Sequence, residues 1–229
     1  MRLSVIIPTL NEARYIRRLV DHLFENVAGG DLEVIVVDGG STDDTVSIAQ
    51  TTPATVVSIV EKGRARQMNY GAGMARGEVL YFVHADTLPP ASYFKDIEKS
   101  VSSGYALGRY QTRFASNNWL LKINAFFTRF DWFVCYGGDQ TLFIAKELFD
   151  SIGGYRENML LMEEYELVER ARKQARYQVM PGAALVSARK YEQNSWLQVQ
   201  QANYRIVQLY KKGCSQEMLV AAYKKFLRT

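Results

Sequence analysis

Short apolar runs alternate with helical patterns through residues 1–90, and this alternation constrains the fold more than any other feature of the chain. The runs cover residues 3–8, 32–37, 55–60 and 79–83. Between the first two runs, Ile16, Leu19, Val20 and Leu23 recur at helical spacing. A continuous apolar run bounded by polar residues is typical of a strand that is buried on both faces. The pattern therefore predicts an α/β fold with a doubly wound, mostly parallel sheet and flanking helices.

Polar residues follow these predicted strands where they end. The fourth run leads into a polar tip that ends in Asp86, and the second run leads directly into Asp38. In an open α/β sheet, ligands bind just beyond the carboxyl ends of the strands. A carboxylate in that place suits a hard divalent cation, which can in turn hold a diphosphate. An aspartate after a strand is also a common turn or cap residue, but the repetition of the pattern favours a ligand site.

The pattern changes after Pro90, although no linker or repeat separates the two parts. We predict a single domain over residues 1–229, with halves at 1–90 and 91–192 and a helical segment at 193–229. The further predicted elements are strands at 105–114, 141–143 and 177–186 and helices at 118–134, 146–152 and 163–174.

The charge of the chain is moderately positive, with a net value of +4 and an isoelectric point of about 9.0. This favours anionic partners such as nucleotide sugars, phosphates or acidic lipid surfaces. The basic residues are dispersed without a recognition motif, so we predict no binding to nucleic acid. Cys135 and Cys214 are far apart, as is typical of reduced cytosolic thiols. With no signal peptide and no membrane span expected, the predicted location is the cytoplasm, or a peripheral place at the inner face of the membrane.

Seven segments along residues 3–192 carry a family pattern. They are Ser4-Val5-Ile6-Ile7-Pro8-Thr9-Leu10-Asn11-Glu12, Val36-Val37-Asp38-Gly39-Gly40-Ser41-Thr42-Asp43, Gly63-Arg64-Ala65-Arg66-Gln67-Met68-Asn69-Tyr70-Gly71-Ala72, His84-Ala85-Asp86-Thr87, Gly138-Asp139-Gln140, Gly153-Gly154-Tyr155 and Leu161-Met162-Glu163-Glu164-Tyr165-Glu166-Leu167. Jointly they resemble glycosyltransferase family 2. The segments around Asn69 and His84 are most similar to a bacterial subgroup described as arsenosugar-type glycosyltransferases.

The resemblance implies a GT-A fold and an inverting, metal-dependent enzyme. Such an enzyme moves a sugar from a nucleoside-diphosphate sugar, here expected to be UDP- or GDP-linked, to an acceptor hydroxyl. The Gln-x-x-Arg-Trp motif of processive polysaccharide synthases is missing, so transfer of a single sugar is favoured. The residues that would bind the nucleotide are Pro8, Leu10, Glu12, Asp38, Arg64 and Asn69.

Three of these residues each have a specific predicted role in nucleotide binding and an alternative structural role. Asp38 would accept from a nucleobase N–H; its alternative is to cap the next helix, which Ser41, Thr42 or Asp43 can do instead. Arg64 would bind phosphate at a helix start; its alternative is to belong to a solvated basic face. Glu12 would line the nucleoside pocket, or else complement a helix dipole.

The resemblance makes Asp86 the ligand of Mn²⁺ or Mg²⁺. The family more often has two aspartates flanking one residue here, whereas this chain has His84 in the first place. Glu163 and Glu164 match the family's Glu-Asp pair at a helix start. This implies that Glu164 is the general base, with Glu163 as the fallback. Acids also favour a helix start through its dipole, so charge alone leaves both roles open.

The acceptor side is the least defined part of the prediction. Asp139 and Gln140 would form an acceptor loop, and Arg189 would close over the diphosphate. An aromatic stripe consists of Trp119, Leu120, Ile123, Phe126, Phe127, Phe130 and Phe133. Core packing is its first explanation. With Lys122 and Arg129 beside it, a lipid-linked acceptor or a membrane surface is the second.

Two other functions stay open. A nucleotidyltransferase also uses a doubly wound sheet and a metal-binding aspartate. It would normally carry a glycine-rich, basic loop after the first strand, where this chain has Pro8-Thr9-Leu10-Asn11-Glu12. A catalytically degenerate nucleotide-sugar-binding protein is kept open by His84 and Glu164, which depart from the family pattern. A glycosyltransferase remains the leading hypothesis.

Overall fold

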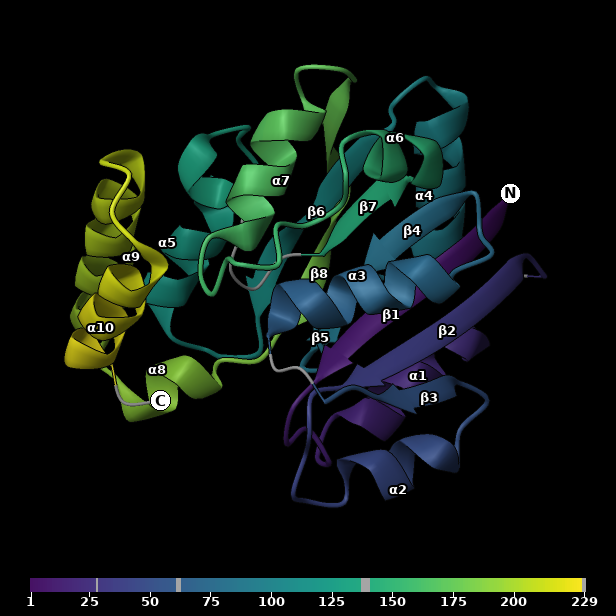
Figure 1. Ribbon diagram of the computed structural model, residues 1–229, viewed down its shortest axis with the longest axis horizontal. Helices are drawn as coiled ribbons and strands as arrows, with labels where there is room; N and C mark the ends of the chain where they lie inside the picture. Colours follow the sequence, from purple (N-terminus) through teal and green to yellow (C-terminus); the bar gives the residue numbers. More distant parts are fainter. Residues whose placement is uncertain (28, 61–62, 137–140, 228–229) are drawn as a thin grey trace.

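The computed structural model describes residues 1–27, 29–60, 63–136 and 141–227, and these form one sheet with helices on both faces (Figure 1). The strands are β1 (Arg2–Thr9), β2 (Asp31–Asp38), β3 (Thr55–Ser58), β4 (Val79–Phe82), β5 (Thr87–Leu88), β6 (Leu107–Phe114), β7 (Leu142–Ala145) and β8 (Tyr177–Val186). The helices are α1 (Ile16–Glu25), α2 (Thr45–Gln50), α3 (Arg64–Met74), α4 (Tyr93–Ser102), α5 (Trp119–Phe127), the 3-10 helix η1 (Phe133–Cys135), α6 (Lys146–Ser151), α7 (Glu163–Ala171), α8 (Arg189–Gln193), α9 (Trp196–Lys211) and α10 (Gln216–Phe226). The predicted α/β architecture is confirmed.

One half of the sheet is parallel and follows the order β3-β2-β1-β4. The register pairs Thr9 of β1 with Asp38 of β2, and Asp38 with Ser58 of β3. Beyond β4, Val83 N donates to Ile6 O, so the polar tip continues beside β1. The polar ends of the first, second and fourth strands therefore meet at one edge, as the sequence predicts.

The core lies on both faces of this half because β1 alternates its side chains. Val5 and Ile7 pack on one face against Leu19 of α1. Ile6 packs on the other face against Met68 of α3. All five side chains are fully buried, and each burial contributes about 1.5–3 kcal/mol. A strand buried on both sides gives the residues at its end a rigid base.

Helix α3 lies unusually close to the sheet at Gly71. A Cβ atom at this glycine would come 2.6 Å from Cγ2 of Ile6 and 3.0 Å from Cγ2 of Val37. The missing side chain therefore allows the helix axis to approach β1 and β2. This approach brings the start of α3, with Arg64, to the carboxyl edge of the sheet (Figure 1).

The other half of the sheet is mixed. Strand β7 is antiparallel to β4 and β6, β8 is parallel to β6, and β5 is antiparallel to β8. In the last pair Thr87 lies opposite Val186, and Ser187 N donates to Asp86 O at 3.1 Å. The short β5–β8 ladder thus returns the chain to the strand-end edge just before α8.

Helix α5 is shorter than the helix predicted over residues 118–134. The buried Arg109 of β6 donates from Nη1 to Thr128 O at 2.7 Å and from Nη2 to Phe130 O at 3.0 Å. Thr128 Oγ1 also accepts from Thr112 N at 2.9 Å. These contacts hold residues 128–130 against β6, so the chain turns away from the helix axis after Phe127.

The prediction that the aromatic stripe packs into the core is wrong. Only Leu121 of α5 is buried. The exposed members of the stripe are Trp119, Ile123, Phe126, Phe127 and Phe130. Helical spacing predicts that apolar side chains share a face, but it does not state what covers that face, and no described residue buries this one.

Helices α8, α9 and α10 gather at one end of the molecule beside α5 (Figure 1). Ser195 and Gln198 form a capping box that starts α9. Trp196 Nε1 then donates to Asn124 Oδ1 of α5 at 3.3 Å. Among the described residues, no helix is both long enough and apolar enough to cross a bilayer.

Candidate active site

The carboxylate of Asp38 organises the loop that follows β2. It is buried, and its Oδ2 accepts from Gly40 N at 2.9 Å and from Ser41 N at 3.0 Å. Its Oδ1 accepts from the hydroxyls of Ser41 and Thr9. A carboxylate has about four lone-pair sites, so these donors use its capacity. Asp38 therefore holds the turn in this structure, and contact with a nucleobase requires one hydroxyl to turn away.

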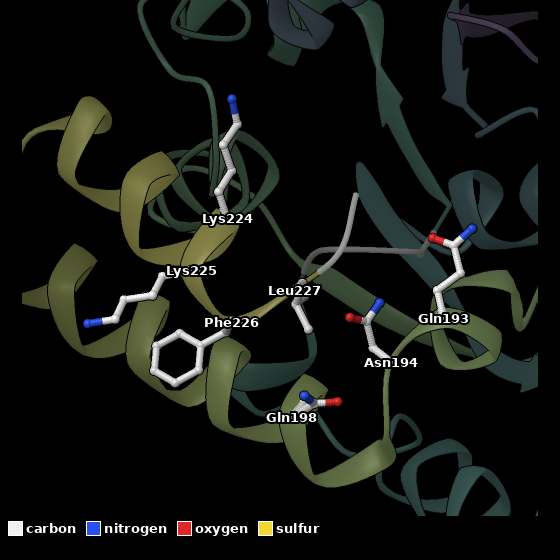
Figure 2. A pocket seen from close by; sticks show the side chains of 7 residues that line it. All are labelled: Gln193, Asn194, Gln198, Lys224, Lys225, Phe226 and Leu227. Carbon is white, nitrogen blue, oxygen red and sulfur yellow. The ribbon is translucent and has the colours of Figure 1, made fainter.

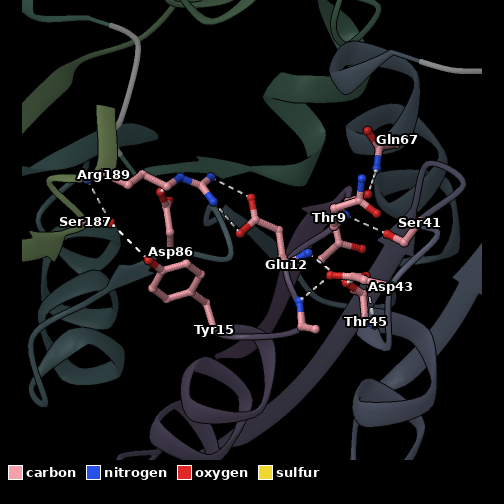
Figure 3. A network of polar contacts seen from close by, with 12 residues as sticks. Thr9, Glu12, Tyr15, Ser41, Asp43, Thr45, Gln67, Asp86, Ser187 and Arg189 are labelled. Atoms are coloured by element: carbon pink, nitrogen blue, oxygen red, sulfur yellow. Dashed lines mark hydrogen bonds and ion pairs between the residues drawn. The ribbon is translucent and has the colours of Figure 1, made fainter. Parts of the chain in front are cut away.

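The loops after β1 and β2 are bonded to each other (Figure 3). Asn11 N donates to Ser41 Oγ at 2.8 Å, and Thr42 N donates to Asn11 Oδ1 at 2.9 Å. Asp43 Oδ1 accepts from Thr45 N at 3.0 Å. The N-cap position of α2 is Asp44, without a side-chain cap. Ser41 and Thr42 therefore do not cap α2, because their side chains bind Asp38 and Asn11, whereas Asp43 accepts from the first N–H of the helix.

Gln67 is a site residue that sequence reasoning missed. It lies on α3 and is buried, and its Nε2 donates to Thr9 O and Val37 O at 2.8 Å each. A buried amide between two strand ends fixes their separation. Its sequence signal is a polar residue on the apolar side of a helix, between Ala65 and Met68, where burial would leave it needing partners.

Arg189 joins two of the predicted site residues into one cluster (Figure 3). Its guanidinium donates to Glu12 Oε1 at 2.6 Å and Oε2 at 2.8 Å, and its Nε lies 3.1 Å from Asp86 Oδ2. Hydrogen bonding to Glu12 and the charges of Asp86 and Glu12 raise the pKa of Arg189, although burial opposes them. One protein cation therefore balances two carboxylates at the strand-end edge.

A second cluster forms where α7 begins. His84 Nε2 lies 2.8 Å from Glu164 Oε1, and Arg64 Nη1 lies 3.5 Å from Glu163 Oε1. Glu163 and Glu164 are only 4% and 6% exposed. When Nε2 of the imidazole carries a proton, it donates to Glu164 Oε1. The two residues that depart from the family pattern, His84 and Glu164, are thus in direct contact.

The electrostatics of this second cluster follow from burial. Burial raises the pKa of Glu163 above its ordinary value of 4.5; the charge of Arg64 lowers it, and Glu164 raises it. For His84, burial and Arg64 lower the pKa, whereas the hydrogen bond to Glu164 and the charges of Glu164 and Asp86 raise it. The net pKa of His84 is above 6.5.

The start of α3 contributes Arg64 and, five residues later, Asn69. The Asn69 side chain donates to Tyr155 O and accepts from Tyr155 N, both at 2.8 Å. It thereby fixes the segment that follows Gly154 and precedes α7. The side-chain amide of Asn69 thus already binds the backbone of Tyr155, and a contact of Asn69 with phosphate stays a prediction.

The remaining predicted residues have different fates. Pro8 is buried at the end of β1, and Leu10 is 52% exposed at the edge. Asp139 and Gln140 lie outside the described residues. A hollow of about 480 Å³ adjoins the end of β3; it is lined by Ser58, Ile59, Val60, Arg66, Asn69, Tyr70 and Glu157. This hollow was not expected from the sequence.

The residues present can be compared with what a divalent cation needs. Within the described ranges, no three His, Cys, Asp or Glu side chains gather into a metal-binding group. Asp86 and Glu12 instead share Arg189. Mg²⁺ sites commonly use one or two carboxylates and take other ligands from substrate phosphates and water. The donor set fits a cation that arrives with a diphosphate.

Comparisons with solved structures show the fold. A mannosyltransferase from Pyrobaculum calidifontis, solved with GDP-Man and Mn²⁺, superimposes with a TM-score of 0.71 at 20% identity, over 92% of this chain and 64% of that one. Glucosyl-3-phosphoglycerate synthase from Mycobacterium tuberculosis, solved with Mn²⁺, UDP and glucosyl-3-phosphoglycerate, gives 0.63 at 21% identity, over 93% and 80%. The fold is GT-A.

Comparisons of sequence show the family. A PGL/p-HBAD biosynthesis glycosyltransferase of Mycobacterium bovis is 28% identical over 176 residues, which are 71% of this chain and 66% of the relative. The chain thus spans about two thirds of the length of this curated relative. The family model described as Glycosyl transferase family 2 matches residues 4–156, more than half of the chain. With the GT-A fold and the strand-end carboxylates in place, the chain belongs to glycosyl transferase family 2.

Proposed function

We propose that the protein is an inverting, metal-dependent glycosyltransferase that moves one sugar from a nucleoside-diphosphate sugar to an acceptor hydroxyl. One observation carries the proposal: His84 Nε2 lies 2.8 Å from Glu164 Oε1, and Asp86 follows His84 by two residues on the same tip. The reaction needs a metal ligand and a base at one centre, and these candidates come from opposite halves of the chain.

The donor would bind across the ends of β1 and β2 and the start of α3. Its predicted contacts are Pro8, Leu10, Glu12, Asp38, Arg64 and Asn69. Asp38 would exchange one hydroxyl donor for a nucleobase N–H, and the hollow beside β3 gives the base room. The similar folds solved with GDP-Man and with UDP support a GDP- or UDP-linked donor.

Asp86 would hold the divalent cation, Mn²⁺ or Mg²⁺, which neutralises the charge of a departing diphosphate when bound. Arg189 has to release Asp86 for this. Its planar fork of N–H donors suits diphosphate oxygens as well as carboxylates. Arg189 would thus balance Asp86 and Glu12 before the donor binds, and the diphosphate afterwards.

Glu164 would act as the general base. It would accept the proton of the acceptor hydroxyl while that oxygen attacks the anomeric carbon, a contribution of about 10²–10⁴ in rate. The His84 N–H holds this carboxylate in one orientation. Glu163 is the weaker candidate, because it faces Arg64 and is the more buried of the two. Glutamate is one methylene longer than aspartate, and His84 occupies the space beside it.

One experiment separates this function from the two alternatives. The protein is incubated with Mn²⁺ and a panel of UDP- and GDP-sugars, with and without pyrophosphate, and the nucleotides are separated by chromatography. A glycosyltransferase releases nucleoside diphosphate, by slow transfer to water if no acceptor is present. A nucleotidyltransferase forms nucleoside triphosphate and sugar 1-phosphate from pyrophosphate. Donors that raise the melting temperature but are recovered unchanged would overturn the proposed activity and indicate a binding protein.

Finer predictions from the sequence stay within this proposal. They are the arsenosugar-type subgroup, the cytoplasmic location, the division of the domain near residues 90 and 192, and acceptor contacts from Asp139 and Gln140. The acceptor is a hydroxyl compound, with lipid-linked acceptors included. A screen of acceptors by mass spectrometry tests the last point, because each product gains the mass of one sugar.

A further inference from the structure

Helix α5 and the turn after it present an apolar surface to solvent. The exposed fractions of Trp119, Phe126 and Trp132 are 64%, 47% and 49%. We call this surface the aromatic patch, and it consists of Trp119, Ile123, Phe126, Phe127, Phe130, Trp132 and Val134. Its rings pack mainly on one another; the centroids of Phe130 and Trp132 are 4.8 Å apart. A contiguous exposed surface of this kind marks an interaction site.

The charges around the aromatic patch are mostly positive. The Arg129 guanidinium lies 4.0 Å from the centroid of Phe126, and Lys122 is exposed on the same helix. Asp131 is the one acidic residue in residues 119–134, and it pairs with Arg172. Aromatic rings flanked by cations that keep their charged ends in water are typical of surfaces that lie at a membrane interface.

Nearly all of the net positive charge of the chain lies in the helical hairpin formed by α9 and α10. Residues 196–227 contain five lysines or arginines and one acid, Glu217, whereas the whole chain has a net charge of +4. The remainder of the chain is therefore close to neutral. Lys224 and Lys225 are exposed, and both belong to the lining of a polar hollow that also includes Asn194 and Gln198 (Figure 2).

The hairpin and the aromatic patch belong to the same end of the molecule (Figure 1). Phe133, next to the patch, stacks on Tyr210 of α9 with centroids 6.3 Å apart, and Lys211 Nζ lies 4.6 Å from the Phe133 centroid. Trp196 of α9 donates to Asn124 of α5. Aromatic and cationic side chains are thus combined on one end.

We propose that this end of the protein docks on a bilayer that contains anionic lipids. Trp and Phe side chains prefer the headgroup region, and lysine and arginine near the surface are attracted by anionic headgroups. A second copy of the chain is a poorer occupant. A two-fold contact through the aromatic patch would bring two cationic hairpins together, and like charges repel. The positive charge of this end therefore favours an anionic lipid surface over a second copy of the chain.

The test is sedimentation of the full chain with vesicles. One set contains phosphatidylglycerol and phosphatidylcholine in equal parts, and the other contains phosphatidylcholine alone. We expect binding to the anionic set, weakened by salt, with a blue shift in the fluorescence of Trp119 and Trp132. Trp119→Ser with Phe126→Ser, and separately Lys224→Glu with Lys225→Glu, should each weaken partition by roughly tenfold or more.

Matched controls keep the test specific. Lys95→Glu with Lys99→Glu makes the same charge change on the exposed side of α4, and Met74→Ser removes an exposed apolar side chain from α3. Both controls should bind vesicles as wild type does. Wild type that stays in the supernatant, or controls that lose binding equally, would overturn the proposal. A dimer in solution that Trp119→Ser with Phe126→Ser dissociates would also overturn it, because the occupant is then a second copy.

Discussion

At Asp86, a guanidinium of the protein and a divalent cation would compete for one carboxylate. Arg189→Gln removes the protein competitor. We expect this variant to bind Mn²⁺ without nucleotide about fivefold more tightly than wild type, since a partly exposed charged pair is worth about 1 kcal/mol. Calorimetric titration measures the affinity. Asp86→Ala is the control that should lose the site. Equal Mn²⁺ affinity in all three proteins would show that Asp86 is not the ligand.

Glu164 offers a test of the base that leaves the donor site intact. Glu164→Gln keeps the shape of the side chain and removes the proton acceptor, so only the transition state is affected. We expect kcat to fall by about 10²–10⁴ while the Kd for the nucleotide is unchanged. Glu163→Gln is the matched control and should keep most activity. If the two variants exchange these results, the base is one residue earlier than proposed.

Glu163 also predicts how stability depends on pH. Burial first of all raises its folded pKa above 4.5, so the folded state holds the proton more tightly than the unfolded state. The contribution of Glu163 to the free energy of unfolding is therefore fully present at pH values below its unfolded pKa. It is lost as the pH rises through the raised pKa of the folded state. Glu163→Gln should be more stable than wild type at neutral pH and equal to it below about pH 4. Urea unfolding across this range measures the difference; a constant difference would contradict the burial argument.

Helix α3 contains a matched pair of glycines that tests its close approach to the sheet. At Gly71 a Cβ would meet Ile6 at 2.6 Å, whereas at Gly73 it would have no neighbour within 4 Å. Gly71→Ala should destabilise the fold by about 1–3 kcal/mol, because overpacking forces the helix away. Gly73→Ala should stabilise it by about 0.5–1 kcal/mol through helix propensity. Thermal unfolding measures both, and similar effects from the two changes would contradict the packing.

The sequence predicts best those elements whose own residues indicate how they are buried. Strands β1, β2 and β4 are apolar throughout because both faces are buried, and the structure places them as predicted. The stripe of α5 shows the limit of this reasoning. Its spacing predicts one apolar face, but burial depends on what the rest of the chain brings to that face. Arg109, whose contacts end the helix, lies on strand β6 and not on the helix itself.

The candidate site shows the same limit more sharply. Asp38, Asp86 and Arg64 are predictable because strand ends and helix starts in an α/β sheet face one edge. The pairing of Arg189 with Asp86 depends on β5, a strand of two residues that the sequence pattern does not reveal. The contact of His84 with Glu164 joins residues from two halves of the sheet. Pairwise contacts between distant elements follow from the complete topology, not from local patterns.

In the whole molecule, the excess positive charge and the candidate active site lie in different places. The strand-end site balances its carboxylates with Arg189 and Arg64, whereas the excess positive charge lies on α9 and α10. In the absence of vesicles, mutations on one end should therefore leave ligand binding at the other end unchanged. Unchanged nucleotide affinity of Lys224→Glu with Lys225→Glu, measured without vesicles, is the expected result. A loss of affinity would show that the hairpin acts on the donor directly.

Arg189 is the first residue of α8, and α8 leads into α9. A donor that takes Arg189 away from Asp86 would therefore pull on the segment that joins the candidate active site to the end that we propose docks on lipid. Linked equilibria are reciprocal: whatever factor the vesicles apply to nucleotide affinity, the nucleotide applies to vesicle affinity. Two titrations, each with the other ligand present or absent, measure that factor. If it exceeds one, the time that the protein spends on a membrane would report the local supply of its donor.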